Sequence, residues 1–338
     1  MKVWWITLAS SYLLCLVAGL NAKTVYDNGY YVKKYNKFFS GIAATILILV
    51  AGLRNGIGDT PIYMGGFKKD APSTIQGSIK LLFSGKKDVG FYFYQGILKT
   101  IKNDPNVFIF VTSLITIILI FITYYKYSQM LELSIFLFIA TGCYLVTMNG
   151  VRQYLASAIL FFCFPLIHER KWKIYLPIVL VCSTIHKSAL IFLVLYFIVD
   201  KPAWGNTTKW ILFIGIALFV TYPISGPIIA NLLGETQYGE YKDALMSTGQ
   251  GANMIRVLVM AVPVVLSYMG RDFLKGKERY YNCIVNFSVI NLIFILLATK
   301  FWIYARFNMY FSVYMIILIT WCVKYMFDEK NTKIIYLM

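Results

Sequence analysis

A succession of long apolar segments constrains the fold of this chain most strongly. We place eleven of them at about residues 3–20, 38–53, 107–125, 132–148, 152–167, 173–185, 187–200, 210–223, 253–270, 281–299 and 305–324. A helix needs about 20 apolar residues to cross ~30 Å of hydrocarbon, where it must satisfy its own backbone polar groups. The expected fold class is therefore all-α, a polytopic transmembrane helical bundle with about 11 spans, in a single membrane domain over residues 1–338.

Composition excludes several other classes of protein. The chain is 59% hydrophobic and 14% charged, too apolar for a soluble domain of this length. Its net charge of +17 is explained by basic cytoplasmic loops, so we do not expect nucleic acid as a partner. All six cysteines fall inside apolar runs without a CxxC pair, which predicts neither a zinc site nor a redox pair.

The distribution of basic residues predicts the orientation. With the amino terminus outside, the inner loops hold 17 lysines and arginines, while the outer side holds seven besides those of one long loop. Residues 54–106 and 224–252 then form larger extracytoplasmic loops. In the first loop we expect two short helices near 74–84 and 89–102, with Ser73 and Asp88 as N-caps. In the second, acidic and aromatic residues suit either sugar binding or ordinary solvation.

Four of the seven arginines lie at or near the ends of apolar runs, on the side predicted to be outer: Arg54, Arg152, Arg256 and Arg306. Arginine at membrane depth is costly and usually faces an anion or a cavity. Guanidinium groups bind phosphate oxygens in pairs, so four at one level would neutralise a pyrophosphate. No DxD motif occurs, so we predict no bound metal ion, and no cofactor is expected.

The segment RNGIGDTPIY at 54–63 is the densest polar cluster. Gly56 and Gly58 allow close backbone approach to a ligand, and Asp59 and Tyr63 follow them. The alternative is an ordinary glycine-containing loop whose arginine extends to the membrane surface.

Three shorter motifs contribute the other polar candidates. NGVRQ at 149–153 adds Gln153, and IHKSA at 185–189 adds His186, which we place at a turn between two short spans. A histidine can take a proton from a hydroxyl, although a lone one more often bonds a neighbouring helix. YARFNMY at 304–310 flanks its arginine with Tyr304 and Tyr310, which an aromatic belt would also explain.

These motifs, in this order, resemble the EpsG/Wzy-like family of bacterial polysaccharide polymerases over most of the chain. The landmarks are the 54–63 segment, the DVGFYF stretch from Asp88, the motif around Arg152, then His186 and Arg306. The chain departs from the family pattern at Asp88, where a glutamate is expected, and at Thr60.

The resemblance implies a GT-C-like membrane glycosyltransferase acting on an undecaprenyl-diphosphate-linked oligosaccharide. It would sit in the bacterial inner membrane, with the active site facing the periplasm or exterior and with flippase and chain-length regulator proteins as possible partners. We expect His186, Asp59 or Asp88 to act as the catalytic base. Pyrophosphate would be bound by Arg152, Arg306, Arg54 and Arg256, and the rest of the substrate by Gly56, Gly58, Tyr63, Gln153, Tyr304 and Tyr310.

Two alternatives stay open from sequence. An O-antigen ligase or another lipid-linked glycosyltransferase would use similar chemistry on a different acceptor. A transporter or flippase of lipid-linked sugars would also need phosphate-binding arginines, but it should carry inverted repeats, which the sequence does not display.

Overall fold

A computed structural model describes residues 2–85, 87–226, 228 and 251–327. The chain divides into two compact units, unit 1 (residues 1–193) and unit 2 (residues 194–338). Most of the predicted 224–252 loop, including its acidic and aromatic residues, lies outside the described residues.

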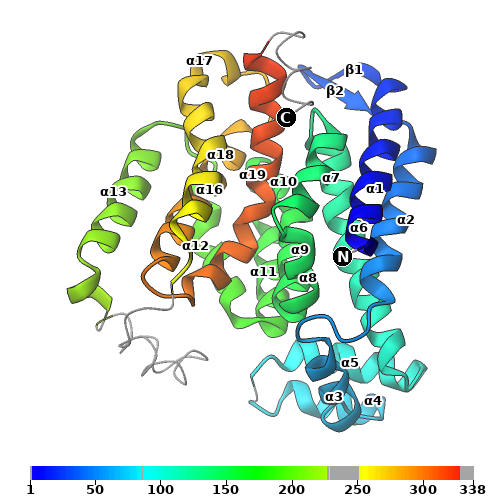
Figure 1. The fold of residues 1–338 in the computed structure, drawn as a ribbon. Coiled ribbons are helices and arrows are strands. Elements are labelled where there is room, and N and C mark those ends of the chain that lie inside the picture. The colour runs from blue at the N-terminus through cyan, green and yellow to red at the C-terminus, as the bar shows by residue number, and fades with distance from the viewer. Residues whose placement is uncertain (1, 86, 227, 229–250, 328–338) are drawn as a thin grey trace. The chain divides into compact units, whose positions relative to one another are not determined.

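Unit 1 is a helical bundle with a hairpin at one end and three short helices at the other (Figure 1). Helices α1, α2, α6, α7 and α9 pack side by side, and α11 packs against α9 and α5. In chain order the elements are α1 (Lys2–Leu20), β1 (Lys23–Asp27), β2 (Tyr30–Lys34), α2 (Lys37–Gly52), α3 (Thr60–Lys69), α4 (Ile75–Leu82), α5 (Val89–Ile101), α6 (Pro105–Tyr127), α7 (Leu131–Ala140), α8 (Cys143–Asn149), α9 (Val151–Cys163), α10 (Pro165–His168), α11 (Trp172–Ile185) and the 3₁₀ helix η1 (Lys187–Leu190). Helix α12 (Ile191–Ile198) crosses the boundary between the units.

Unit 2 is built around two long antiparallel helices. It contains α13 (Asn206–Val220), α16 (Met254–Met269), α17 (Arg271–Leu274), α18 (Tyr281–Ala298) and α19 (Tyr304–Met326). Helix α18 packs against α19, α16 and α13. Buried amides join these helices: Asn308 Nδ2 donates to Asn291 Oδ1 at 2.6 Å, and Thr208 donates to Asn286 at 2.7 Å. Such bonds satisfy polar groups that an apolar bundle would otherwise leave unpaired.

The eleven predicted apolar segments all form helices, but few are long. Within the described residues, four helices are long and apolar enough to cross a membrane: α1, α6, α18 and α19. Helices α7 and α8 together make a fifth candidate, bent by 55°. Helices α2, α9, α11, α13 and α16 and the η1–α12 segment are apolar but only 10–17 residues long, below the usual spanning length. The structure thus supports an all-α membrane protein, whereas the number of eleven spans and the GT-C-like architecture stay predictions.

The break between α7 and α8 has a local cause. Gly142 adopts φ +80°, a left-handed conformation that ends α7, and α8 starts at the next residue in a new direction. This bend carries Asn149, the last residue of α8, to the 54–60 loop.

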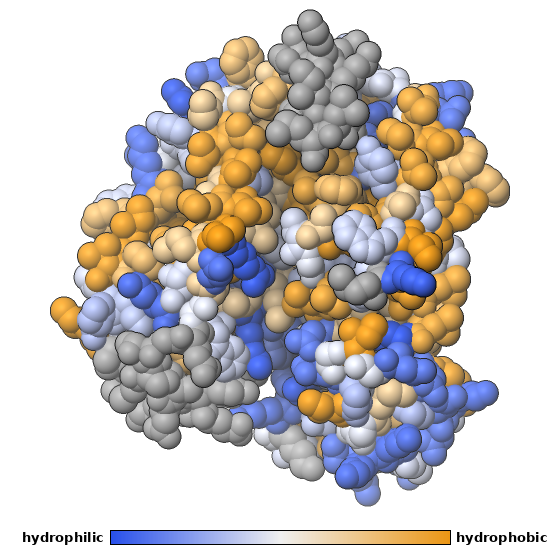
Figure 2. Space-filling view, in the orientation of Figure 1, coloured by the Kyte–Doolittle hydropathy of each residue, from blue (hydrophilic) through white to orange (hydrophobic). Residues whose placement is uncertain are grey.

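The predicted long loop 54–106 is largely helical. Helices α4 and α5 match the two expected short helices, and α3 is an additional one. The predicted N-cap Ser73 is wrong by one residue, because the Thr74 side chain accepts the capping bond from Gly77. Figure 2 shows hydrophilic residues gathered over α3–α5, whereas hydrophobic residues dominate the helices above them.

Candidate functional site

A buried aspartate connects two of the predicted motifs in unit 1. The Asp88 carboxylate pairs with Arg152 through an Nη1–Oδ2 distance of 2.8 Å. Its other oxygen lies 4.0 Å from His186 Nδ1, and only 8% of the Asp88 side chain and 9% of the His186 side chain are exposed. Arg152 and His186, which follow Asp88 by 64 and 98 residues, thus meet at one carboxylate. We call these three residues the Asp88 cluster (Asp88, Arg152 and His186).

Local structure explains why the Asp88 carboxylate faces inward. Asp88 precedes α5, where an aspartate commonly caps the helix, but its side chain makes no capping bond. Instead its backbone is left-handed, with φ +55°. That conformation aims the carboxylate at α9 and at the turn after α11. The expected N-cap is therefore a site residue.

Close helix packing brings His186 to this position. At Gly90, in the first turn of α5, an added Cβ would lie 2.0 Å from Thr184 Oγ1 and 2.9 Å from the Thr184 backbone carbon. Only glycine permits this approach of α5 to the end of α11. His186 follows as the C-cap of α11, in an extended conformation, and η1 then begins.

The Asp88 carboxyl has a perturbed affinity for protons. Burial raises the pKa of Asp88, and Arg152, the Lys187 backbone N–H and Lys87 partly offset this effect by favouring the carboxylate. A buried carboxylate between a guanidinium and an imidazole is suited to orienting the imidazole or accepting a proton.

Arg152 also borders a cavity of about 250 Å³ in the layer of short helices. Its guanidinium carbon lies 5.9 Å from the ring centres of both Tyr63 and Phe91. One nitrogen, Nε, is buried and has no hydrogen-bond partner among the described residues. The cavity wall consists of Asp59, Ile62, Tyr63, Gly66, Asp70, Phe91, Tyr92, Gln95 and Arg152. The predicted residues Asp59, Tyr63 and Arg152 are therefore together.

Arg54, by contrast, is used by the protein itself. It is 6% exposed, and its nitrogens donate to Thr60 Oγ1 at 2.9 Å, Ser113 Oγ at 2.7 Å and the carbonyls of Ala51 and Met148. Burial lowers the pKa of Arg54 to about 10, so the group stays charged at neutral pH. These bonds tie the 54–60 loop to α2, α6 and α8, which makes Arg54 a scaffold of the site.

The two glycines of the 54–60 loop differ in how closely other residues pack against them. Both Gly56 and Gly58 adopt positive φ. Gly58 fits against Asn149, whose Oδ1 accepts the Asp59 backbone N–H at 3.0 Å and would lie 2.5 Å from an added Cβ. Gly56 has open space around its Cα. The Asn149 contact fixes the start of α3 and hence Asp59.

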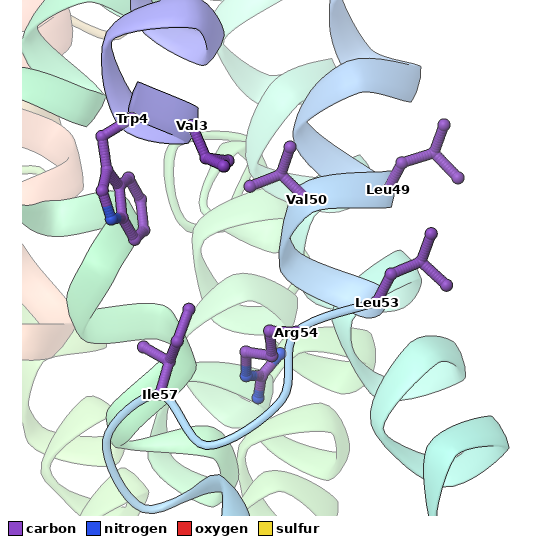
Figure 3. A pocket seen from close by; sticks show the side chains of 7 residues that line it. All are labelled: Val3, Trp4, Leu49, Val50, Leu53, Arg54 and Ile57. Atoms are coloured by element: carbon purple, nitrogen blue, oxygen red, sulfur yellow. The ribbon is translucent and has the colours of Figure 1, made fainter. Parts of the chain in front are cut away.

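A second cavity, of about 480 Å³, opens beside Arg54 between α1 and α2 (Figure 3). Apart from Arg54, its wall is apolar: Val3, Trp4, Leu49, Val50, Leu53 and Ile57. This apolar groove begins where the polar 54–60 loop leaves α2.

The other predicted residues occupy different surroundings. Gln153 is 5% exposed on α9. In unit 2, Arg256 lies in the first turn of α16 and donates to Asn308 Oδ1 at 3.5 Å. Arg306 lies in the first turn of α19, over the Trp302 ring. Tyr304 and Tyr310 are buried in that unit, 7% and 0% exposed. A role for either tyrosine in binding substrate stays a prediction.

Comparison with known families decides the classification. The family model described as the EpsG family matches residues 37–338. The chain belongs to the EpsG family. EpsG is a Wzy-like polysaccharide polymerase family, so the resemblance inferred from sequence is confirmed. Neither a search of curated proteins nor one of solved structures returned a match.

In this EpsG protein, Asp88, Arg152 and His186 were each predicted as site residues, but their pairing and much of the cavity wall were not predicted. Asp70, Tyr92 and Gln95 were not singled out. They face the cavity because α3 and α5 lie together, and α3 was not predicted. A usable signal existed: Asp59, Tyr63, Gly66 and Asp70 follow helical spacing.

Proposed function

We propose that this protein polymerises undecaprenyl-diphosphate-linked oligosaccharide repeat units. It would transfer the growing glycan from its lipid pyrophosphate to the non-reducing end of a new lipid-linked unit. Family membership supports the polymerase activity. The observation that carries the proposed site is the Asp88 carboxylate shared by Arg152 and His186 beside a polar cavity.

In the proposed reaction, the acceptor hydroxyl oxygen attacks the anomeric carbon of the donor. A new C–O bond forms, the bond to the phosphate oxygen breaks, and its electron pair leaves with the pyrophosphate. Positive charge on the sugar ring and negative charge on the leaving phosphate grow together in the transition state. A preplaced guanidinium stabilises the leaving group. We assign this role first to Arg152.

The proton of the acceptor hydroxyl needs a base. We assign it to His186, with Asp88 orienting the imidazole and stabilising the imidazolium. Their 4.0 Å separation exceeds a hydrogen bond, but catalytic contacts often tighten only when substrate is bound. Asp59, which lines the cavity with Arg152, is the second candidate for the base.

The apolar groove in Figure 3 suits the lipid part of such a substrate. It is lined by Val3, Val50 and Leu53 and ends at the 54–60 loop, so a polyprenyl chain there would have its headgroup near the polar site. Arg54 would then position the loop instead of gripping phosphate. Binding of the pyrophosphate by Arg306 and Arg256 stays a prediction.

The test is Arg152→Lys in proteoliposomes supplied with the lipid-linked repeat unit. Lysine keeps the charge but loses the planar fork, so we expect the polymerisation rate to fall about 100-fold, equivalent to roughly 3 kcal/mol. Arg271→Lys, at an exposed arginine of α17, is the matched control and should polymerise normally. Near-normal polymer length with Arg152→Lys would remove the pyrophosphate role.

The same assay separates the alternatives. Polymer attached to the lipid carrier is expected for a polymerase, whereas glycan delivered to a different acceptor would indicate a ligase. A lipid-linked unit that changes leaflet without chain growth would indicate a transporter. A comparison of His186→Gln with wild type then tests the base: full activity would transfer that role to a carboxylate.

A further inference from the structure

The cavity between α3 and α5 carries features that the transfer reaction alone does not require. Helix α3 and its two capping residues contribute one face of the wall, with Asp59, Tyr63, Gly66 and Asp70 at helical spacing. One face of α5 contributes Phe91, Tyr92 and Gln95. At about 250 Å³ the cavity is smaller than the roughly 300 Å³ at which sites for drug-sized molecules begin. It fits a single ring of a substrate better than a whole oligosaccharide.

Gln95 is the residue of this cavity that points most directly to a ligand. Its side chain is 2% exposed, and Oε1 is buried with no hydrogen-bond partner among the described residues. A buried amide oxygen without a donor is unfavourable, and native proteins rarely leave one in that state. Because Gln95 lines the cavity, a rotation of its amide toward the cavity would let a ligand hydroxyl supply the missing hydrogen.

The rest of the wall favours a sugar over other donors. The carboxylates of Asp59 and Asp70 accept hydrogen bonds from hydroxyl groups. The rings of Tyr63, Phe91 and Tyr92 offer apolar surfaces that the C–H faces of a pyranose can cover. Two carboxylates also disfavour an anionic ring, because a second negative charge beside them would be repelled.

We propose that the α3–α5 cavity is a saccharide subsite for one uncharged sugar ring, with Gln95 Oε1 and the Asp70 carboxylate accepting hydrogen bonds from its hydroxyls. This proposal rests on the proposed function for the identity of the whole substrate. Arg152 both lines the cavity and pairs with Asp88. The ring in the cavity is therefore the donor sugar joined directly to the pyrophosphate, with its phosphate toward Arg152.

Direct binding tests the subsite without any catalysis. The protein in nanodiscs is mixed with glucose, galactose, N-acetylglucosamine and N-acetylgalactosamine, and with glucuronic acid as the charged counterpart, and binding is followed by saturation-transfer NMR. We expect at least one neutral sugar to bind at millimolar concentration and glucuronate to bind at least tenfold more weakly. Binding of glucuronate alone, or of no sugar, would overturn the proposal.

Three variants locate the bound sugar. Gln95→Met removes the acceptor at similar size. Gly66→Leu fills the cavity. A Cβ atom at position 66 would have Asp70 Oδ2 as its nearest neighbour, at 3.6 Å, so the helix has room for the start of a side chain. Both should weaken binding at least tenfold. Gln76→Met, on the exposed side of α4, is the control and should bind like wild type. Unchanged binding in both cavity variants would place the sugar elsewhere and overturn the subsite.

Kinetics on the lipid-linked repeat unit separate the two proposals. Gln95→Met should raise the KM about tenfold while changing kcat less than threefold, because the ring is bound similarly before and during transfer. An unchanged KM would contradict the proposed subsite but would not affect the proposed polymerase function. Sugar binding that depends on Gln95 in a protein unable to polymerise would support the subsite and defeat the proposed function.

Discussion

At the residue scale, chemically similar side chains have different tasks. Arg54 and Arg152 were predicted to serve one anion. Arg54 donates to four acceptors of the protein, whereas Arg152 pairs with one carboxylate and borders a cavity. Sequence located both guanidinium groups at the ends of apolar runs. It could not distinguish them, because the partners of Arg54 include carbonyls and Ser113, which is 59 residues away.

Arg54→Lys tests the scaffold role. One ammonium cannot replace a fork that reaches Thr60, Ser113 and two carbonyls, and buried acceptors would lose their donors. We expect a loss of roughly 2–4 kcal/mol in stability, seen as a lower midpoint of thermal unfolding in detergent. A variant that melts like wild type but no longer polymerises would instead return Arg54 to substrate binding.

The raised pKa of Asp88 predicts that polymerisation depends on pH and that a charge change at a neighbouring surface residue shifts this dependence. Exposed Lys87 lowers this pKa, so Lys87→Gln should raise it further. The acid limb of polymerisation should then move to higher pH at low salt, and less so at high salt. Lys80→Gln, on the exposed side of α4, should leave the limb in place. A downward shift would contradict the assignment.

Protonation of Asp88 should affect the activity and the stability of the protein differently. Burial raises the pKa of Asp88 in the folded protein, so protonation of this group does not reduce stability. Any stability contributed by the protonated form is instead lost as pH rises through the raised pKa. On acidification, activity should therefore fall through loss of the Arg152 pair before the protein unfolds. Circular dichroism recorded along the same titration checks the order.

At the element scale, short helices bring together residues that are distant in sequence. The apolar runs and helices α4 and α5 were predictable from composition and periodicity. Helix α3 was not, because its glycines, lysines and proline suggest a loop. The β1–β2 hairpin was also missed, although Asn28-Gly29 is a strong turn signal and both residues have positive φ. The cavity wall could not be predicted without α3.

Gly90→Ala tests whether close packing of α5 on α11 sets the site. The new methyl group would collide with Thr184, so α5 must move away from His186. We expect roughly 1–3 kcal/mol of destabilisation and a strong loss of polymerisation. Gly65→Ala, with open space around it on α3, should keep both stability and activity. Equal behaviour of the two variants would show that the approach of α5 is not required.

At the scale of the molecule, two different polar structures form the ends of unit 1. The Asp88 cluster and the hydrophilic α3–α5 layer lie at one end, and the basic β1–β2 hairpin lies at the other (Figures 1 and 2). The excess of basic residues in the predicted inner loops predicts a cytoplasmic location for the hairpin. The orientation of the bundle stays a prediction from these charges. The count of membrane crossings could not be confirmed, because several apolar helices are shorter than a usual span.

Cysteine labelling checks this orientation. Ser73→Cys, between α3 and α4, should react in intact cells with a reagent that cannot cross the membrane. Thr24→Cys, exposed on β1, should react only after permeabilisation. Five native cysteines are buried and Cys163 is half-buried, so background labelling should be low. The reverse pattern would place the Asp88 cluster in the cytoplasm.

The left-handed backbone at Asp88 has a consequence for how the site is maintained. A side chain other than glycine holds that conformation at an energetic cost, and here the Arg152 pair holds it in place. An anion that drew Arg152 away would release the turn before α5 and let it relax toward an ordinary helix start. In the proposed reaction, departure of the pyrophosphate would let the pair re-form, so each turnover would return the Asp88 carboxylate to its starting position.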